Sequence, residues 1–526
     1  MKYKVLITTS GIGNHLGEMT KYTNQSLLKV GDKPSISYII ENYPKQTNFV
    51  ITLGHFGQQI KDFLQLAYPH KNFTFVTVDN YQEKGSNLVY SMLQAEKDLQ
   101  CPFIFHTSDS ITTDPVPFPQ INWCGGYKST GSSLYRSFDV VDNYVQKFHE
   151  KGKIDPDFIH IGLIGIHDYQ KFWQSAKSVY KENPNNTSLS DVHILSALIK
   201  NNLPLKVHQF KNWYDVGKLD NFYKAQKNFK SKHLLLEKKD ESIFFYKNFV
   251  IKFFFDSDIV RKRVKRAKLL KKIIPRIESH KTNFYRYRYA KGEVFSKIVN
   301  TKTIIELIKW AEIKLWTPPK KNITNFPNYC RDFYIRKTNK RVKQFYDTRN
   351  VQDTTNIING IKIPKLSIIM ELLDHDRLCN SRPTLFHGDF ILDNILKTDT
   401  GFCLLDWRQD FAGVLNAGDK YYDLAKLNHN LTLNHQILVD NLFKIKFKDK
   451  EIDLEVYRRQ KLVDCQNKLL NYLKIQGYDI TKINILTSLV WLNMSPLHQH
   501  PLDLFLYYFG KYNLWTNLIK SQNEEY

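Results

Sequence analysis

Short apolar segments alternate with amphipathic stretches over about the first 230 residues, and this alternation limits the possible folds more than any other feature of the sequence. The apolar segments read YKVLITT, SISYIIENYP, NFVITLGH, FTFVTVDN and CPFIFHTSD, and we expect them to be strands. Strands separated by stretches long enough for a helix are typical of an α/β layer with a mostly parallel sheet. The sequence therefore predicts an α/β domain over residues 1–230.

The rest of the chain follows a different pattern. Residues 226–242, QKNFKSKHLLLEKKDES, are polar and lysine-rich, and we predict a linker there. A strand-like pair, SIFFYKNFVIKFFF, comes next, and helical periodicity dominates from about residue 300. A chain of 526 residues is too long for one hydrophobic core. We therefore predict two domains, residues 1–230 and residues 240–526.

Composition excludes several classes of protein. The chain is 42% hydrophobic and 14% aromatic, which is typical of a globular protein. No apolar run approaches the roughly 20 residues that a membrane span requires, and no signal peptide is recognisable, so we expect a cytoplasmic protein without a transmembrane segment. The six cysteines lack CxxC or other metal-ligand spacing, which indicates reduced thiols.

The chain is strongly basic, with a formal net charge of +24, and the densest basic run is RKRVKRAKLLKKIIPR, residues 261–276. Apolar residues recur at helical spacing along this run: Val260, Val264, Ala267, Leu270 and Ile274. We predict an amphipathic helix whose basic face is either solvated or binds phosphorylated metabolites or nucleotides. No nucleic-acid-reading motif accompanies the charge, so we expect no nucleic-acid partner.

A group of polar residues in the second domain has the spacing that phosphoryl transfer requires. HGDFILDNIL contains Asp389 and, five residues later, Asn394, and LLDWRQDF adds Asp406. Phosphoryl transfer needs a carboxylate that orients the attacking hydroxyl and metal ions that bridge the phosphates. Asp389 can supply the first function, and the oxygen atoms of Asn394 and Asp406 suit Mg²⁺.

These motifs, together with YYDLAKL, resemble the aminoglycoside phosphotransferase and choline/ethanolamine kinase superfamily over about residues 240–510. The resemblance implies an α+β protein-kinase-like fold, ATP and Mg²⁺ as cofactors, and a small-molecule alcohol as substrate. It implies Asp389 as the catalytic base and His387 as a residue that orders the catalytic loop. It also implies Asn394 and Asp406 as metal ligands.

The same resemblance assigns roles to two further residues. Asp423 would be a structural anchor. Lys252, flanked by apolar residues in FVIKFFF, would bind the nucleotide, although a lysine on a strand can also be a solvated edge residue. The helix that should offer Lys252 a glutamate contains none, and Glu278 lies beyond Pro275. The ion-pair partner of Lys252 is therefore left open.

The first domain begins with a strand that runs into a glycine loop, TTSGIGNHLGEMT. Gly11 and Gly13 would let main-chain amides approach phosphate oxygens, because a side chain at either position would obstruct them. A simple turn is the alternative interpretation.

The glycine loop, followed by SLLKVGDKPSISYII, HTSDS and WYDVG, resembles the sugar-nucleotidyltransferase family over about residues 1–225. The resemblance implies a Rossmann-like α/β fold and the coupling of a nucleoside triphosphate, CTP or another, to a phosphorylated sugar or aminoalcohol with release of pyrophosphate. It implies that Asp109 and Asp215 hold Mg²⁺. It also implies that Gly85 and Ser86 of EKGSNL contact the nucleotide base and that HIGLIGI receives the acceptor.

Two positions depart from this family's pattern. His15 and Gln25 stand where the family has an arginine and a lysine. Losing a fixed transition-state charge commonly reduces the rate by about 10²–10³. We therefore expect a first domain that is slow, altered in its acceptor, or inactive.

The two resemblances together predict a bifunctional enzyme. Its kinase would phosphorylate a small alcohol (a sugar or a choline- or ethanolamine-like compound) with ATP, and its nucleotidyltransferase would couple the resulting phosphate to a nucleotide for the decoration of surface glycans or lipids. The alternative is a small-molecule kinase with a non-catalytic nucleotide-binding domain. A third hypothesis, a nucleic-acid-binding protein, depends on charge alone.

Overall fold

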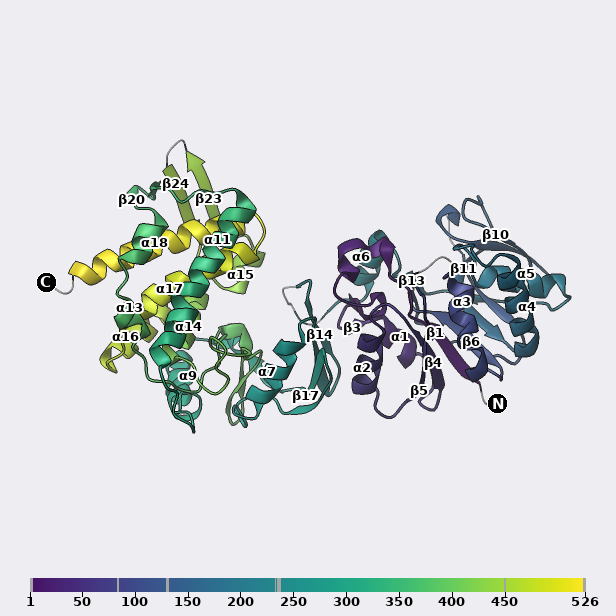
Figure 1. Ribbon diagram of the computed structural model, residues 1–526, viewed down its shortest axis with the longest axis horizontal. Helices are drawn as coiled ribbons and strands as arrows, with labels where there is room; N and C mark the ends of the chain where they lie inside the picture. Colours follow the sequence, from purple (N-terminus) through teal and green to yellow (C-terminus); the bar gives the residue numbers. More distant parts are fainter. Residues whose placement is uncertain are drawn as a thin grey trace. The chain divides into compact units, whose positions relative to one another are not determined.

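The computed structural model describes residues 3–82, 85–128, 132–231, 233, 238–448 and 451–523. The chain forms two compact units of mixed α/β structure (Figure 1). The first unit consists of Met1–Ser257 and Glu278–Tyr287, and the second consists of Asp258–Ile277 and Arg288–Tyr526.

The first unit is built around a nine-stranded sheet with the order β5-β4-β1-β6-β11-β8-β12-β10-β9. The strands of the unit are β1 (Lys4–Thr8), β2 (Lys29–Val30), β3 (Lys33–Pro34), β4 (Asn48–Leu53), β5 (Asn72–Thr77), β6 (Phe103–Thr107), β7 (Ser110–Thr112), β8 (Trp123–Tyr127), β9 (Ser137–Val141), β10 (Tyr144–His149), β11 (Phe158–Ile166), β12 (Lys206–Phe210), β13 (Trp213–Asp215), β14 (Glu241–Phe245), β15 (Phe249–Phe254), β16 (Ile277–His280) and β17 (Phe284–Arg288). Its helices are α1 (Ser35–Glu41), α2 (Gly57–Ala67), α3 (Leu88–Leu93), α4 (Tyr169–Glu182), α5 (Asp191–Lys200) and α6 (Leu219–Asn228).

Helices cover both faces of this sheet. Side chains on a strand alternate between faces, so Val5 and Ile7 of β1 pack in the same core as α1 and α2, while Leu6 packs in the core that contains α3, α4 and α5. The strands β5, β4, β1 and β6 are parallel, as predicted, and β11 joins them antiparallel. The predicted α/β layer is therefore confirmed.

The order of the parallel strands determines where a ligand can bind. From β1 the chain continues to β4 and β5 on one side, and then returns to place β6 on the other side of β1. In open α/β sheets, ligands bind outside the carboxyl ends of the strands at such a switch in direction. The segments that follow Thr8 of β1 and Thr107 of β6 therefore lie at the expected ligand-binding edge.

Two expectations about the first half of the chain need correction. SISYIIENYP is not a strand, because Ser35–Glu41 forms the helix α1. Its buried Ile36, Ile39 and Ile40 follow helical spacing, which the short apolar run concealed. The predicted linker 226–242 is helical up to Asn228, where α6 ends. Residues 232 and 234–237 of that stretch lie outside the described part of the chain.

The strand-like pair is present as the antiparallel strands β14 and β15, and it extends a four-stranded sheet of order β14-β15-β17-β16. This small sheet packs on α1 and α2 of the first unit. Phe63 contacts Phe244 and Phe284 at ring-centroid distances of 5.4 and 6.0 Å, and the hydroxyls of Ser37 and Tyr246 lie 2.7 Å apart. Strands that the sequence analysis assigned to the second domain therefore belong to the first compact unit.

The second unit is mainly helical, with a three-stranded sheet of order β18-β21-β22 and a four-stranded sheet of order β20-β19-β24-β23. Its strands are β18 (Glu293–Val294), β19 (Asn356–Ile358), β20 (Ile361–Ile363), β21 (Ile395–Thr398), β22 (Gly401–Leu404), β23 (Phe443–Lys448) and β24 (Glu451–Val456). Its helices are α7 (Ser257–Ala267), α8 (Phe295–Ile298), α9 (Thr301–Lys314), α10 (Phe326–Arg331), α11 (Lys337–Arg349), α12 (Leu366–Glu371), α13 (His375–Cys379), α14 (Lys420–Thr432), α15 (His435–Val439), α16 (Gln460–Ile475), α17 (Ile480–Met494) and α18 (Leu502–Asn523).

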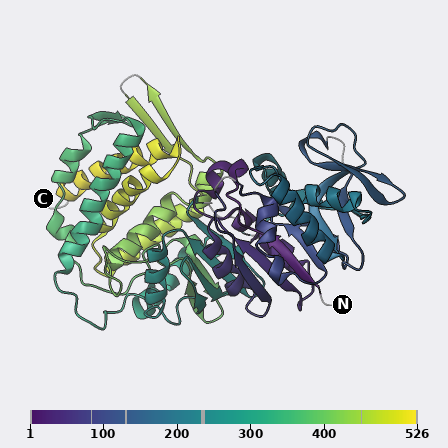
Figure 2. The same cartoon turned by 45° about the vertical axis from the view of Figure 1, so that its right-hand side comes forward.

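The core of the second unit lies among its long helices (Figures 1 and 2). The helix α17 contacts α14, α11 and α18. It is apolar on most of its surface, as expected for a helix that neighbours surround. Among the described residues, none of the helices has both the length and the apolar character needed to cross a membrane.

The basic helix predicted over 261–276 is shorter and less exposed than expected. It is α7, which ends at Ala267. Arg263 and Arg266 are buried, so the prediction of a solvated basic face is wrong for these two residues. The guanidinium of Arg266 donates to the carbonyls of Leu415, at 3.1 Å, of Phe386, at 2.5 Å, and of Arg408. An arginine has five N–H donors, which lets one side chain hold three main-chain segments together.

We expect Arg266→Met to lower the free energy of unfolding by about 3 kcal/mol or more, because the buried carbonyl of Phe386 and the partly buried carbonyls of Leu415 and Arg408 would lose their donor. Urea unfolding followed by circular dichroism measures the change. Lys265→Met is the matched control, because Lys265 is the exposed neighbour on the same helix and should change stability little. Equal effects of the two substitutions would contradict a structural role for Arg266.

Candidate active sites

Two carboxylates meet at the switch point of the first unit. Asp109 follows β6, and Asp215 ends β13. The strands β7 and β13 are antiparallel with Ser110 opposite Asp215, and the amide of Val216 donates to the carbonyl of Asp109 at 2.9 Å. Burial and the nearby charge of Asp215 raise the pKa of Asp109 to about 6. The two carboxylates therefore repel each other in the absence of a cation.

Residues next to Asp109 and Asp215 let the two segments approach each other closely. A Cβ atom on Gly217 would lie only 2.5 Å from Oδ2 of Asp109, so any larger residue there would displace the Asp109 carboxylate. The carboxylate of Asp215 is held by three donors: the Tyr135 hydroxyl at 2.9 Å, Asn221 Nδ2 at 2.7 Å and the Gly217 amide at 2.8 Å. These three hydrogen bonds hold the Asp215 carboxylate in place.

The glycine loop lies after β1 at the same edge of the sheet. Asn24, which is fully buried, fastens it by donating to the carbonyls of Thr9, at 2.9 Å, and His55, at 2.6 Å. Gly13 has φ +76°, and a Cβ there would lie 2.8 Å from Oε1 of Gln25. The uncharged amide of Gln25 therefore contacts the loop where the family pattern has a cation.

The helix α3, which begins at the end of the EKGSNL segment, contacts this loop. Ser91 on α3 lies 3.1 Å, hydroxyl to hydroxyl, from Ser10 of the glycine loop. Gly85 is buried, and a Cβ there would lie 2.9 Å from the carbonyl of Pro184, so the chain packs closely at this glycine, and its contact with a nucleotide base stays a prediction. Ser86 is half-buried, and its contact with a nucleotide base stays a prediction. The first two residues of the motif, 83 and 84, lie outside the described residues.

Sequence reasoning missed a buried charge pair beside this site. His160, in the HIGLIGI strand, has its Nε2 atom 2.6 Å from Oδ2 of Asp191, the first residue of α5. Although burial opposes its protonation, Asp191 raises the pKa of His160 to about 10. The only signal in the sequence was a histidine inside an apolar strand, which does not reveal its partner.

In the second unit, Asp423 organises the HGD segment. Its carboxylate accepts hydrogen bonds from the amides of His387 and Gly388, at 2.8 and 2.7 Å, and from Trp316 Nε1 at 3.0 Å. Burial raises the pKa of Asp423 to about 6. The position of Asp423 agrees with the anchoring role that the sequence predicted.

His387 connects the HGD segment to the strand end that contains Asp406. Its Nε2 atom lies 2.7 Å from the carbonyl oxygen of Leu405, so Nε2 carries the proton and donates it. Burial lowers the pKa of His387 to about 4, which keeps the ring neutral at physiological pH. A neutral, buried histidine orders the loop and is not placed to exchange protons with solvent.

Asp389 lies between an amide and an ammonium group. Asn394 Nδ2 donates to its Oδ2 at 2.8 Å, and Lys426 Nζ lies 2.8 Å from its Oδ1. Although burial opposes its ionisation, Lys426 lowers the pKa of Asp389. Asp389 is therefore an oriented carboxylate at neutral pH, able to accept a hydrogen bond from a hydroxyl. Lys426 was not predicted, although it lies in YYDLAKL one helical turn after Asp423.

Asn394 and Asp406 are brought together by the main chain. The amide of Leu405 donates to the carbonyl of Asn394 at 2.7 Å, and Asp406 follows with φ +56°. The carboxylate of Asp406 forms an ion pair with Arg263 of α7. The helix expected to offer a glutamate to Lys252 thus presents an arginine to a predicted metal ligand.

The chemistry of both sites fits Mg²⁺. Magnesium is usually held by one or two carboxylates together with substrate phosphates, not by a cage of protein ligands alone. Asp109 with Asp215, and Asp406 with the oxygen of Asn394, are ligand sets of this kind. In the described ranges, no group of three or more His, Cys, Asp or Glu side chains is arranged to hold a metal.

Lys252, the predicted nucleotide-binding residue, belongs to the first compact unit. It lies on β15 of the first unit, opposite Ile243 of β14, and is almost completely buried. It is therefore not a solvated edge residue, and its role in nucleotide binding stays a prediction. Glu278 lies on β16, where its carboxylate accepts from Arg286 at 3.0 Å.

Comparison with known proteins finds solved structures that are similar to the N-terminal part of the chain. The CTP:phosphocholine cytidylyltransferase of Streptococcus pneumoniae is 18% identical, with a TM-score of 0.39, over 44% of this chain and 100% of that one. The inositol-1-phosphate CTP transferase of T. maritima is 16% identical, with a TM-score of 0.35, over 44% and 98%. A nucleoside-diphosphate-sugar pyrophosphorylase of Vibrio cholerae is 12% identical, with a TM-score of 0.37, over 42% and 99%.

No family model matches the chain, and the search of curated proteins finds no match. Identities this low, with TM-scores below 0.5, do not decide an activity for this chain. Its function has to be inferred from the site residues.

We expect Asp109→Asn to raise the free energy of unfolding by about 1–3 kcal/mol at pH values well above 6, because it removes a charge that folding holds against Asp215. The pKa of Asp109 rises on folding from 3.8 to about 6. The destabilisation caused by ionised Asp109 therefore reaches its full size at pH values well above 6. This destabilisation fades as the pH falls from 6 toward 3.8, and the gain should disappear over that window. Urea unfolding across this pH range measures it.

Asp220→Asn is the control, because Asp220 is exposed on α6 and its substitution should change stability little. Added Mg²⁺ should stabilise the unsubstituted chain but not Asp109→Asn. A gain that persists at low pH would contradict charge repulsion as its cause.

Proposed function

We propose that the chain is a bifunctional enzyme that combines a small-molecule kinase in the second unit with a nucleotidyltransferase in the first. The observation that carries this proposal is that each unit has its own cluster of predicted site residues that includes carboxylates. Asp109 and Asp215 lie at the ligand-binding edge of the first sheet, and Asp389 lies beside Asn394 and close to the Asp406 segment in the second unit.

The kinase site is arranged for transfer of the γ-phosphoryl group of ATP to an alcohol. The carboxylate of Asp389 accepts the hydrogen bond of the substrate hydroxyl and then its proton, while the hydroxyl oxygen attacks the γ-phosphorus and ADP leaves. Lys426 and Asn394 hold the Asp389 carboxylate in one orientation. Mg²⁺ at Asp406 and Asn394 would neutralise phosphate charge.

The first unit would then use the phosphorylated alcohol. An oxygen of its phosphate attacks the α-phosphorus of a nucleoside triphosphate, CTP or another, and pyrophosphate leaves. The glycine loop supports this role, because it lies at the same sheet edge as Asp109 and its residue Gly11 is exposed. Mg²⁺ at Asp109 and Asp215 would balance the charge of the triphosphate. The product is an activated headgroup for glycan or lipid decoration, made in the cytoplasm where nucleotides are available.

A second candidate function has one observation in its favour. The two positions where the family has an arginine and a lysine are occupied by His15, which is exposed, and by Gln25, whose uncharged amide contacts the glycine loop. Neither residue supplies a fixed cation to a triphosphate. The first unit would then bind a nucleotide without catalysing transfer, and only the kinase would be active.

We expect Asp389→Asn to reduce ATP-dependent phosphorylation of the alcohol by about 10²–10⁴-fold, because the acceptor of the hydroxyl proton is lost. Pyrophosphate release from a supplied phospho-alcohol should be unchanged. Release of ADP and of pyrophosphate, measured separately with ATP and each nucleoside triphosphate, tests both activities of the full chain. Asp393→Asn, in the same loop, is the matched control.

Three outcomes of that experiment are informative. Loss of both activities in Asp389→Asn would contradict two independent sites. Pyrophosphate release that disappears in Asp109→Asn would support the nucleotidyltransferase. Nucleotide binding without pyrophosphate release would favour the second candidate function.

We expect Gly11→Ala to weaken nucleoside triphosphate binding by about tenfold, or about 1.4 kcal/mol, because a methyl group would stand where phosphate oxygens approach the main chain. Stability should stay within about 0.5 kcal/mol, since the new Cβ would lie 3.8 Å from Gln25 Nε2 with no closer neighbour. Gly13→Ala should instead lose about 1–2 kcal/mol of stability, because its backbone is left-handed.

Isothermal titration calorimetry and urea unfolding, applied to both variants, separate the two effects. Unchanged nucleotide affinity in Gly11→Ala would show that this loop is a turn with no ligand.

A further inference from the structure

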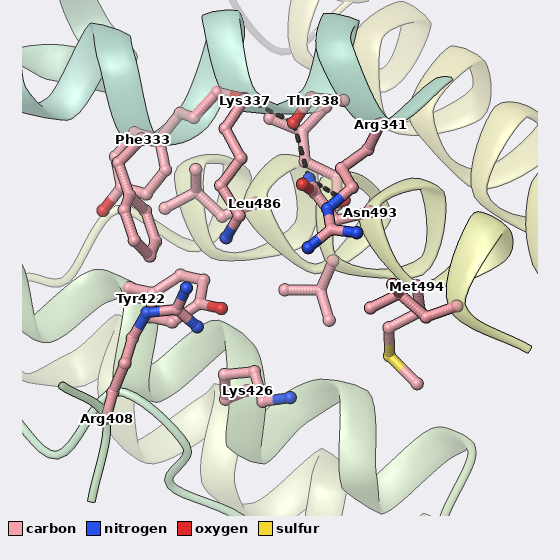
Figure 3. A pocket seen from close by; sticks show the side chains of 14 residues that line it. Phe333, Lys337, Thr338, Arg341, Arg408, Tyr422, Lys426, Leu486, Asn493 and Met494 are labelled. Carbon is pink, nitrogen blue, oxygen red and sulfur yellow. Dashed lines mark hydrogen bonds between the residues drawn. The ribbon is translucent and has the colours of Figure 1, made fainter. Parts of the chain in front are cut away.

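A small, basic cavity opens beside Asp389 in the second unit (Figure 3). Its volume is about 150 Å³, compared with roughly 300–1,000 Å³ for typical ligand pockets. Lys337 and Arg341 reach it from α11, Arg408 from the segment after β22, and Lys426 from α14. Figure 3 shows the charged ends of these four side chains directed toward the space between α11 and α14.

The cavity is directly connected to the predicted catalytic base. Lys426 lines the cavity, and its ammonium group lies 2.8 Å from the Asp389 carboxylate. The amide of Arg408 donates to the carbonyl of His387, two residues before Asp389. A small molecule in the cavity would therefore contact Lys426, which binds the carboxylate that we assign to hydroxyl activation.

Three of the four cations have no carboxylate partner within the described ranges. The ammonium of Lys337 and the guanidinium of Arg408 lie over the same ring, that of Phe333, at 4.1 and 4.9 Å. The side chain of Arg341 donates only to the neutral Oε1 of Gln344, at 3.4 Å. Asp410 is the acidic residue whose charge acts on Lys337, and its carboxylate is bound by Lys262 at 2.9 Å.

This crowding of like charge is unfavourable in the free protein. Burial, together with Arg408, Arg341 and Lys426, holds the pKa of Lys337 well below its ordinary value. Positive charges in a partly dehydrated space repel one another strongly, and an anion placed among them would relieve that repulsion. Arginine guanidinium groups match carboxylate and phosphate groups in shape, which suits them to this role.

Two polar atoms of the cavity walls have unused hydrogen-bonding capacity. Oδ1 of Asn493 and Nε of Arg408 are buried and accept or donate no hydrogen bond in the described structure. Asn493 is oriented by its Nδ2 atom, which donates to the Thr338 hydroxyl at 2.6 Å. Buried polar groups are almost always paired, so these two atoms are exceptions among the residues that line the cavity.

We propose that the alcohol phosphorylated at Asp389 is a small acidic alcohol, whose carboxylate or phosphate group is bound by Lys337, Arg341 and Arg408. This inference rests on the proposed kinase function and narrows its substrate class. Choline, ethanolamine and other cationic alcohols would add positive charge to a cavity that already has an excess of it. The apolar wall formed by Leu486, Leu489 and Val490 of α17 suits the short carbon chain of such a compound.

The test uses the full-length chain with ATP and five alcohols of similar size: glycerol, choline, ethanolamine, glycerate and glycerol 3-phosphate. We expect at least one of the two acidic alcohols to exceed the other three by about tenfold or more in kcat/KM for ADP release. Comparison of glycerate with glycerol 3-phosphate distinguishes a carboxylate from a phosphate. Faster turnover of choline, ethanolamine or glycerol would overturn the inference and leave the kinase proposal intact.

Variants test the assigned residues. Arg341→Gln should raise KM for the acidic alcohol by about tenfold with little change in kcat, because it removes a binding charge and not a reacting group. Lys340→Gln is the matched control, since Lys340 is the exposed neighbour on α11 and does not line the cavity. Equal effects of the two variants would contradict the assignment.

A binding measurement separates this inference from the kinase proposal. Glycerate or inorganic phosphate should raise the Tm of the unsubstituted chain, and the increase should be lost in Arg341→Gln but kept in Lys340→Gln. If none of the five alcohols supports ADP release, the kinase proposal is contradicted. The Tm measurement then tests the anion site by itself. No anion-dependent rise in Tm in the unsubstituted chain would overturn the site.

Discussion

Repulsion between like charges that the protein itself does not neutralise is the constraint that shapes both candidate sites. In the first unit the charges are the carboxylates of Asp109 and Asp215, and in the second they are the cations around the cavity beside Asp389. Each arrangement costs folding free energy in the absence of a ligand. Each is therefore complementary to the opposite charge: a cation in the first unit and an anion in the second. We propose that a triphosphate brings the cation and that the alcohol supplies the anion.

Such groups stay in place because buried, hydrogen-bonded residues support the loops that contain them. In the first unit, Asn24 uses buried hydrogen bonds to fix the glycine loop. In the second, Asp423 holds the two amides that precede Asp389, and Arg266 joins the segments around it through main-chain carbonyls. These residues belong to the supporting structure, and their burial explains why the loops that they hold can present charge at fixed positions.

Motifs with short spacing could be read directly from the sequence. Asp389 and Asn394 are five residues apart in one loop, so their proximity in the structure follows from local geometry. The limits of prediction appear where a contact joins distant segments. Nothing near Arg263 indicates that it pairs with Asp406, and α1 was assigned as a strand because a short apolar run is compatible with either structure. The strands β14 and β15 were found correctly, but their packing on α2 was not.

By itself, the sequence determined the α/β character of the first half, the helical character of the second, and the residue types available to each site. Periodicity and spacing are local properties, so they specify elements and loops. Only the tertiary structure decided which charges face one another. Arg341, Arg408 and Lys426 come from separate elements and meet because α11 and α14 pack against α17, and nothing in their local sequence encodes that meeting. The electrostatic preference of the cavity is therefore a property of the packing.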